Sequence, residues 1–233
     1  MTSAAVLLLA SSTIVGTVTF QGPPPRPAPV DMSADPSCAA LHAGGADGGA
    51  VVVAPGGGLA NVFVWLKSGV PAAASPAEPA APPAPVVLDQ LGCIFTPRVI
   101  AVRPGQGLLI RNSDDTLHNT HARPGRESLN REFNIGQPRK GQEAEKRFDA
   151  PQLMIPIGCD VHPWMRAYVS VVDHPYFAVT RSDGTFEIEG VPPGTYEIEV
   201  MHEVLAGQVR RITVEPGRQA HADFTLGPRK KTP

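Results

Sequence analysis

The chain has little charge and few aromatic side chains. Charged residues make up 18% of its 233 residues, aromatic residues make up 6%, and the formal net charge is −2. The one basic cluster, at residues 228–233, is interpreted as a solvated tail. Nucleic-acid-binding proteins display a basic patch or stripe, so we expect no nucleic-acid partner. The sequence also has no apolar run of the roughly 18 residues that a transmembrane helix needs, so we expect no membrane span.

The common signatures of catalysis are also missing. The stretches PGGG and PGQG are not followed by the lysine of a phosphate-binding loop. The serines lack a paired base, so nucleophilic catalysis has no visible support. The stretch CDVH lacks the preceding second cysteine that haem attachment needs. We therefore do not expect an enzyme.

Proline and glycine, in contrast, are abundant, with 26 and 23 residues. Short segments of alternating or β-branched character predict strands at 14–20, 61–69 and 166–173. The segments RVIAV and GLLIRN are predicted to pair around the turn RPGQG, and a short helix is considered at RESLNREF. Residues 71–85, rich in proline and alanine, are interpreted as an extended loop.

The pattern changes at residue 174. Phe186 and Ile188 alternate with polar residues, as do Tyr196, Ile198 and Val200, and the turns SDGT and VPPGT lie beside these segments. This pattern predicts a small antiparallel β-sandwich over residues 174–227, after a first domain over residues 14–173.

The N-terminal stretch AAVLLLA has two interpretations. A short apolar core followed by small residues is typical of a secretory signal, so residues 1–13 are a possible signal remnant. No lysine or arginine precedes the core, however, and a first β-strand is the other interpretation.

The chain has three cysteines, an odd number that leaves one thiol over in an exported protein. Cys159 lies in the stretch CDVHPWM, discussed next. Cys38 and Cys93 remain as a possible disulfide, because exposed free thiols are a liability outside the cytoplasm. Three unrelated buried thiols are the alternative.

The stretch CDVHPWM places Cys159, His162 and Met165 at Cys-x₂-His-x₂-Met spacing. Copper that carries one electron needs soft sulfur to hold Cu(I) and imidazole to suit both oxidation states; a His₂Cys set with a weak axial Met supplies these. The fourth ligand must come from another strand. His118 follows the predicted strand GLLIRN and is the candidate, with His121 as the alternative.

CDVHPWM, together with FTPRVIAVRPGQGLLIRNSDDTLHN, resembles the cupredoxins, and the short ligand loop is most similar to that of amicyanin. The resemblance covers roughly residues 86–173. It implies a Greek-key β-sandwich with one type 1 copper held by His118, Cys159, His162 and Met165. It also implies that Asn119 braces the ligand loop and points its backbone N–H at the thiolate. Pro163 would stiffen the loop, and Trp164 would pack under the site or join a docking patch.

The combination also resembles bacterial plastocyanin-like methylamine-utilisation proteins, in which a carboxypeptidase-regulatory-like or transthyretin-like sandwich follows. This resemblance implies an all-β, two-domain protein of the bacterial periplasm that transfers single electrons. A c-type cytochrome or a periplasmic dehydrogenase is the expected partner. Two alternatives remain open: a binding or adhesion module with structural copper, and a copper storage or delivery protein.

Overall fold

The computed structural model describes residues 12–26, 29–71 and 83–229. Residues 1–11 of the predicted signal remnant, most of the predicted proline- and alanine-rich loop and most of the basic tail lie outside the described residues, whereas residues 12 and 13 of the predicted remnant belong to strand β1 (Ser12–Phe20). The chain divides into two compact units. We call residues 25–51 and 76–175 the central unit, and residues 1–24, 52–75 and 176–233 the terminal unit.

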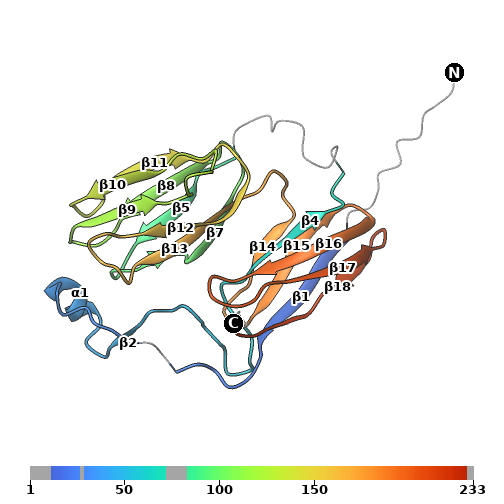
Figure 1. Ribbon diagram of the computed structural model, residues 1–233, viewed down its shortest axis with the longest axis horizontal. Helices are drawn as coiled ribbons and strands as arrows, with labels where there is room; N and C mark the ends of the chain where they lie inside the picture. Colours follow the sequence, from blue (N-terminus) through green and yellow to red (C-terminus); the bar gives the residue numbers. More distant parts are fainter. Residues whose placement is uncertain (1–11, 27–28, 72–82, 230–233) are drawn as a thin grey trace. The chain divides into compact units, whose positions relative to one another are not determined.

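The main part of the central unit is a sandwich of two sheets, shown in Figure 1. The five-stranded sheet has the order β10 (Phe133–Gln137), β9 (His118–Ala122), β12 (Gln152–Gly158), β13 (Arg166–Val171) and β7 (Val99–Val102). The four-stranded sheet has the order β11 (Glu143–Arg147), β8 (Gly107–Asn112), β5 (Val86–Gln90) and β6 (Phe95–Thr96). This is the β-sandwich that the sequence predicted.

Two local predictions for this unit were wrong. RVIAV and GLLIRN do not pair: β7 pairs with β13, whereas β8 pairs with β5 and β11. The turn between them leads from one sheet to the other. Which sheet each strand joins is determined by pairing with strands that are distant in sequence. RESLNREF contains no helix, and its last residue begins strand β10.

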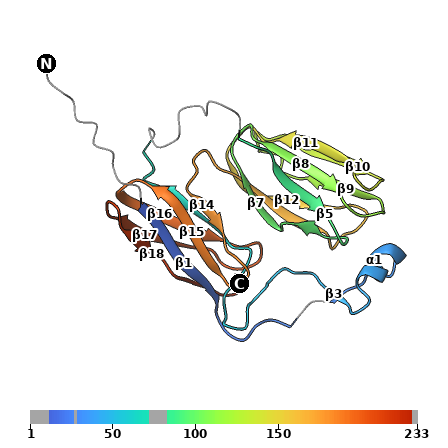
Figure 2. The same ribbon diagram turned by 180° about the vertical axis from the view of Figure 1, so that it is seen from behind.

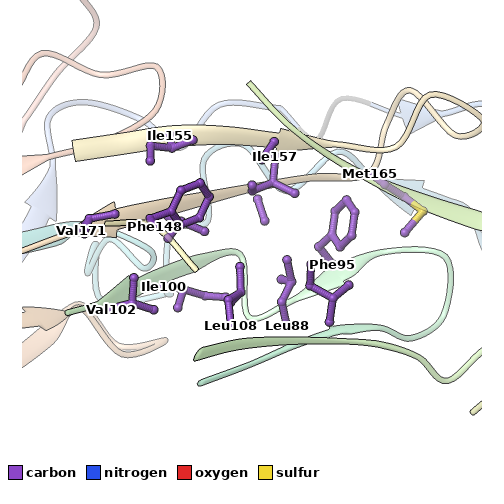
Figure 3. Packing of buried hydrophobic residues seen from close by; sticks show 14 of the residues in the cluster. Leu88, Phe95, Ile100, Val102, Leu108, Phe148, Ile155, Ile157, Met165 and Val171 are labelled. Carbon is purple, nitrogen blue, oxygen red and sulfur yellow. The ribbon is translucent and has the colours of Figure 1, made fainter. Parts of the chain in front are cut away.

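The core of the central unit lies between the two sheets of its sandwich. Buried side chains from both sheets form one cluster, part of which is shown in Figure 3. The fully or almost fully buried members include Leu88, Leu108, Ile110, Phe148, Ile155, Ile157, Ala167, Val169 and Val171. Cys159 and Met165 belong to the same cluster, so both ends of the predicted ligand loop pack into the core.

A short segment, residues 29–47, precedes the sandwich strands; we call it the covering segment. It contains β2 (Pro29–Val30), α1 (Pro36–Leu41) and β3 (Ala46–Asp47). Asp35 caps α1, and Pro36 occupies the first turn, where its missing N–H costs nothing. The predicted disulfide between Cys38 and Cys93 is confirmed. No helix among the described residues has the length and apolarity needed to cross a membrane.

The terminal unit also has two sheets, seen from both sides in Figures 1 and 2. In one sheet, β1 (Ser12–Phe20) pairs with β15 (Thr185–Val191), β18 (Gln219–His221) and β19 (Phe224–Leu226). The other has the order β14 (Phe177–Val179), β4 (Phe63–Ser68), β16 (Gly194–Met201) and β17 (Gln208–Val214). The predicted inward residues Phe186, Ile188, Tyr196, Ile198 and Val200 are all buried.

The structure divides the chain differently from the predicted boundary at residues 173 and 174. Both strands expected at 14–20 and 61–69 exist, but β1 and β4 pair with strands of the terminal unit. The first two strands of the predicted first domain, 14–173, therefore belong to the second sandwich. Alternating patterns identify a strand but not its partner, since any β-strand offers the same backbone groups for pairing.

Candidate metal centre

The ligand loop connects β12 to β13 at one end of the five-stranded sheet. Cys159 follows the last residue of β12, and Met165 precedes the first residue of β13. Two backbone hydrogen bonds close the loop: Cys159 N–H donates to the Met165 carbonyl (3.3 Å), and Met165 N–H donates to the His162 carbonyl (2.9 Å). β9 pairs with β12, so His118 at the start of β9 comes from the neighbouring strand.

His118, Cys159 and His162 bring one ligand atom each to within 4.8 Å of one another. The two Nδ1 atoms are 2.9 Å apart, and His162 Nδ1 is 3.8 Å from Cys159 Sγ. The exposed fractions are 0% for His118, 5% for Cys159 and 2% for His162. Two imidazoles and a free thiol therefore converge in a buried position, although His118 is about 40 residues away in sequence.

Met165, the fourth predicted ligand, is 1% exposed. It belongs to the same core cluster as Cys159, and Figure 3 draws its thioether sulfur at one end of that cluster. Its place in the loop is consistent with a ligand role, which remains a prediction.

Asn119 lies where the cupredoxin resemblance placed it. Its backbone N–H points at Cys159 Sγ at 3.5 Å. Its side-chain oxygen accepts from the backbone N–H of Asp160 (2.7 Å), and Cys159 Sγ lies 3.2 Å from the same oxygen. Asn119 thus connects β9 to the ligand loop and places dipoles beside the sulfur, the kind of contact that tunes a thiolate ligand.

Each histidine has a carboxylate on its outer nitrogen. His118 Nε2 is 3.0 Å from Asp114 Oδ2, and His162 Nε2 is 2.9 Å from Asp35 Oδ2. A neutral imidazole that donates from Nε2 keeps the lone pair of Nδ1 for a metal. Burial lowers the pKa of His118 below its usual value, more than the Asp114 carboxylate raises it, which favours the neutral, metal-binding form.

The carboxylate of Asp35 is held in its charged form. Partial burial acts to raise its pKa, but hydrogen bonds from the Cys38 N–H, His162, Thr116 and the Ser37 N–H outweigh burial and lower the pKa below its usual value. Asp35 is therefore an ionised acceptor facing the buried His162 ring.

The donor set fits copper better than harder metals. One thiol and two imidazoles, with a thioether in the same loop, are the soft and intermediate ligands that select copper or zinc, whereas magnesium and calcium prefer oxygen. Among the described residues, two other groups bring possible ligand atoms within 4.8 Å of one another: Asp35–Cys38–His162 and Cys93–Asp114–His118. Each contains a cysteine of the disulfide, so neither can offer a thiolate.

The remaining predicted residues surround the site. The Trp164 ring lies 5.0 Å from the His162 ring, and Trp164 Nε1 donates to the Cys93 carbonyl at 3.0 Å. Trp164 therefore packs beside the site, in agreement with its predicted packing role. Pro163 is exposed and lines a cavity of about 330 Å³ next to Cys159 and Met165.

His121, the alternative ligand, belongs to no three-residue metal-type group among the described residues. Its Nδ1 lies 3.0 Å from Asp160, and its Nε2 lies 2.7 Å from Glu132. Both ring nitrogens already have carboxylate partners, so the structure favours His118.

Sequence reasoning missed Asp35 and Asp114. Asp114 stands four residues before His118 in SDDTLH, and Asp35 precedes proline in DPSCAA, a typical helix start. These local signals could have indicated a loop and a helix cap. Neither signal could have shown that the two carboxylates face the histidines.

Comparison with known proteins supports the two-part architecture. Residues 162–227 match the carboxypeptidase regulatory-like domain, which confirms the predicted second module. The match starts inside the ligand loop, whereas the last segment of the terminal unit starts at Tyr176. No curated protein matches the chain.

Among solved structures, the chain is similar to a Cu-containing nitrite reductase from Thermus scotoductus SA-01, with 21% identity and a TM-score of 0.36. The match covers 45% of this chain and only 27% of the reductase. The chain is also similar to a Cu(I) form of an amicyanin mutant, with 23% identity over 47% of this chain and 98% of amicyanin, and a TM-score of 0.33.

Proposed function

We propose that the central unit holds one type 1 copper ion at His118, Cys159, His162 and Met165, and that the protein transfers single electrons. The observation that carries the proposal is the convergence of two Nδ1 atoms and one thiol sulfur in a buried site. Bound copper would supply the one-electron couple. The protein's part is to hold soft and imidazole donors in one arrangement that suits both oxidation states.

The chain's own residues support this role in three ways. Buried ligands exclude water from the centre. The backbone N–H of Asn119 and that of His162 both point at Cys159 Sγ, at 3.5 and 3.4 Å, and stabilise a thiolate there. Four protein ligands leave no position for a substrate, so we propose an electron carrier and not an enzyme.

The disulfide favours an oxidising compartment outside the cytoplasm, such as the bacterial periplasm. A redox protein is the partner that this function requires, and a c-type cytochrome or a periplasmic dehydrogenase is the class we propose, by analogy with cupredoxins.

The test is optical and magnetic. The copper-loaded protein is expected to show an intense blue thiolate-to-copper absorption and a type 1 EPR spectrum. Cys159→Ser should abolish both, and so should His118→Asn. His121→Asn is the matched control and should retain both. A wild-type protein that binds Cu(II) but shows no blue absorption would overturn the proposal.

The same samples separate the alternatives. A carrier should give reversible voltammetry and keep its copper when mixed with a Cu(I) chelator. A delivery protein should surrender copper quickly, which the burial of three ligands below 6% exposure disfavours. A binding module with structural copper should keep its partner affinity after Cys159→Ala.

A further inference from the structure

We infer that Asp35 is a positioning residue for His162, brought to the metal centre by the covering segment. The inference deepens the proposed function and rests on it for its redox consequence. Asp35 lies outside both sheets of the sandwich and 127 positions before His162, so only the folded chain brings the two together.

Both oxygens of Asp35 are engaged. Oδ1 accepts from the backbone N–H groups of Ser37 (2.8 Å) and Cys38 (3.2 Å) at the start of α1. Oδ2 accepts from His162 Nε2 (2.9 Å) and from the Thr116 hydroxyl (3.0 Å). The hydrogen bonds from α1 therefore fix the orientation of the carboxylate. A carboxylate held in this way can in turn fix the orientation of the His162 ring.

The covering segment is itself attached to the site. The Cys38–Cys93 disulfide joins α1 to the loop before β6, and the carbonyl of Cys93 accepts from Trp164 in the ligand loop. Cys38 and Cys93 are both 0% exposed. The covering segment thus meets the ligand loop directly through the Asp35–His162 hydrogen bond, and indirectly through the disulfide to Cys93, whose carbonyl accepts from Trp164.

The contacts enclose the outer edge of the His162 ring. Its side chain is 2% exposed, while that of Asp35 is 18% exposed. Cys38 Sγ lies 3.8 Å from Nε2, and the Trp164 ring packs at 5.0 Å. The edge that faces away from Cys159 is therefore covered by protein.

Two consequences follow from this contact. A carboxylate on the outer nitrogen fixes the tautomer and makes the imidazole a stronger donor, which typically changes metal affinity by about 10- to 100-fold. A fixed negative charge beside the centre also favours the more positive oxidation state, so Asp35 lowers the reduction potential. Asp35 is a positioning residue because it acts on the metal through His162.

The experiment compares Asp35→Asn and Asp35→Ala with the wild type. Asp31→Asn is the matched control: it removes the charge of an exposed carboxylate of the same segment that accepts from the Ser33 N–H. The readouts are the reduction potential, the Cu(II) affinity by chelator competition and, in the copper-free protein, the NMR signal of the His162 Nε2 proton.

Asp35→Asn keeps an acceptor but loses the charge, so the potential should rise. Asp35→Ala should also weaken Cu(II) binding by about 10- to 100-fold and speed exchange of the His162 Nε2 proton. Asp31→Asn should change none of these. Unchanged potential, affinity and proton exchange in both Asp35 variants would overturn the inference. The copper-free NMR measurement decides the Asp35–His162 contact even if the wild type proves not to be a type 1 copper protein.

Discussion

Removal of the disulfide offers the sharpest test of how the covering segment is held. Cys38 and Cys93 are 55 residues apart. A cross-link over a loop of this length removes chain entropy from the unfolded state worth about 4 kcal/mol at 25 °C. Both side chains are fully buried, so replacing them with alanine brings no stabilisation that would offset this loss. The Cys38→Ala/Cys93→Ala variant should lose about 4 kcal/mol of unfolding free energy in the central unit.

The assay is urea unfolding of the copper-free protein followed by tryptophan fluorescence. The chain has two tryptophans, Trp65 in the terminal unit and Trp164 in the central unit. A Trp65→Phe background makes Trp164 the only tryptophan, so the signal reports the central unit. The reference is the same background with the disulfide intact. A loss below about 1 kcal/mol would refute the reasoning, since it would show that the cross-link barely restrains the unfolded chain.

Two further predictions concern single side chains. Asn119→Ala leaves the Asp160 N–H and the Cys159 sulfur without their side-chain partner, and should cost about 1–3 kcal/mol in urea unfolding. The exposed Glu127→Ala is the control, and equal losses would contradict the role of Asn119. Gly16→Ala places a Cβ 2.0 Å from the Ala222 carbonyl oxygen and should destabilise the terminal unit by about 1–3 kcal/mol. Gly56→Ala, with nothing within 4 Å, should not, and an unaffected Gly16→Ala protein would count against the backbone packing described.

The local features of this protein were readable from its sequence. Cys159, His162 and Met165 lie within one seven-residue loop, so their spacing alone places them together. Strands such as β15 and β16 were predicted because alternation along a strand reports which side chains face a core. The pairing of Cys38 with Cys93 followed from assigning the third cysteine to the ligand loop.

Other features depended on which distant segments meet. The preference for His118 over His121 as the predicted ligand comes from their surroundings in the fold: His118 lies beside Cys159 and His162, whereas His121 contacts two carboxylates. The partners of β1 and β4 were decided by long-range pairing, since the strand pattern is the same for either sandwich. Asp35 acquired its position only through tertiary structure, because a helix cap looks alike in sequence whether its carboxylate faces water or a buried imidazole.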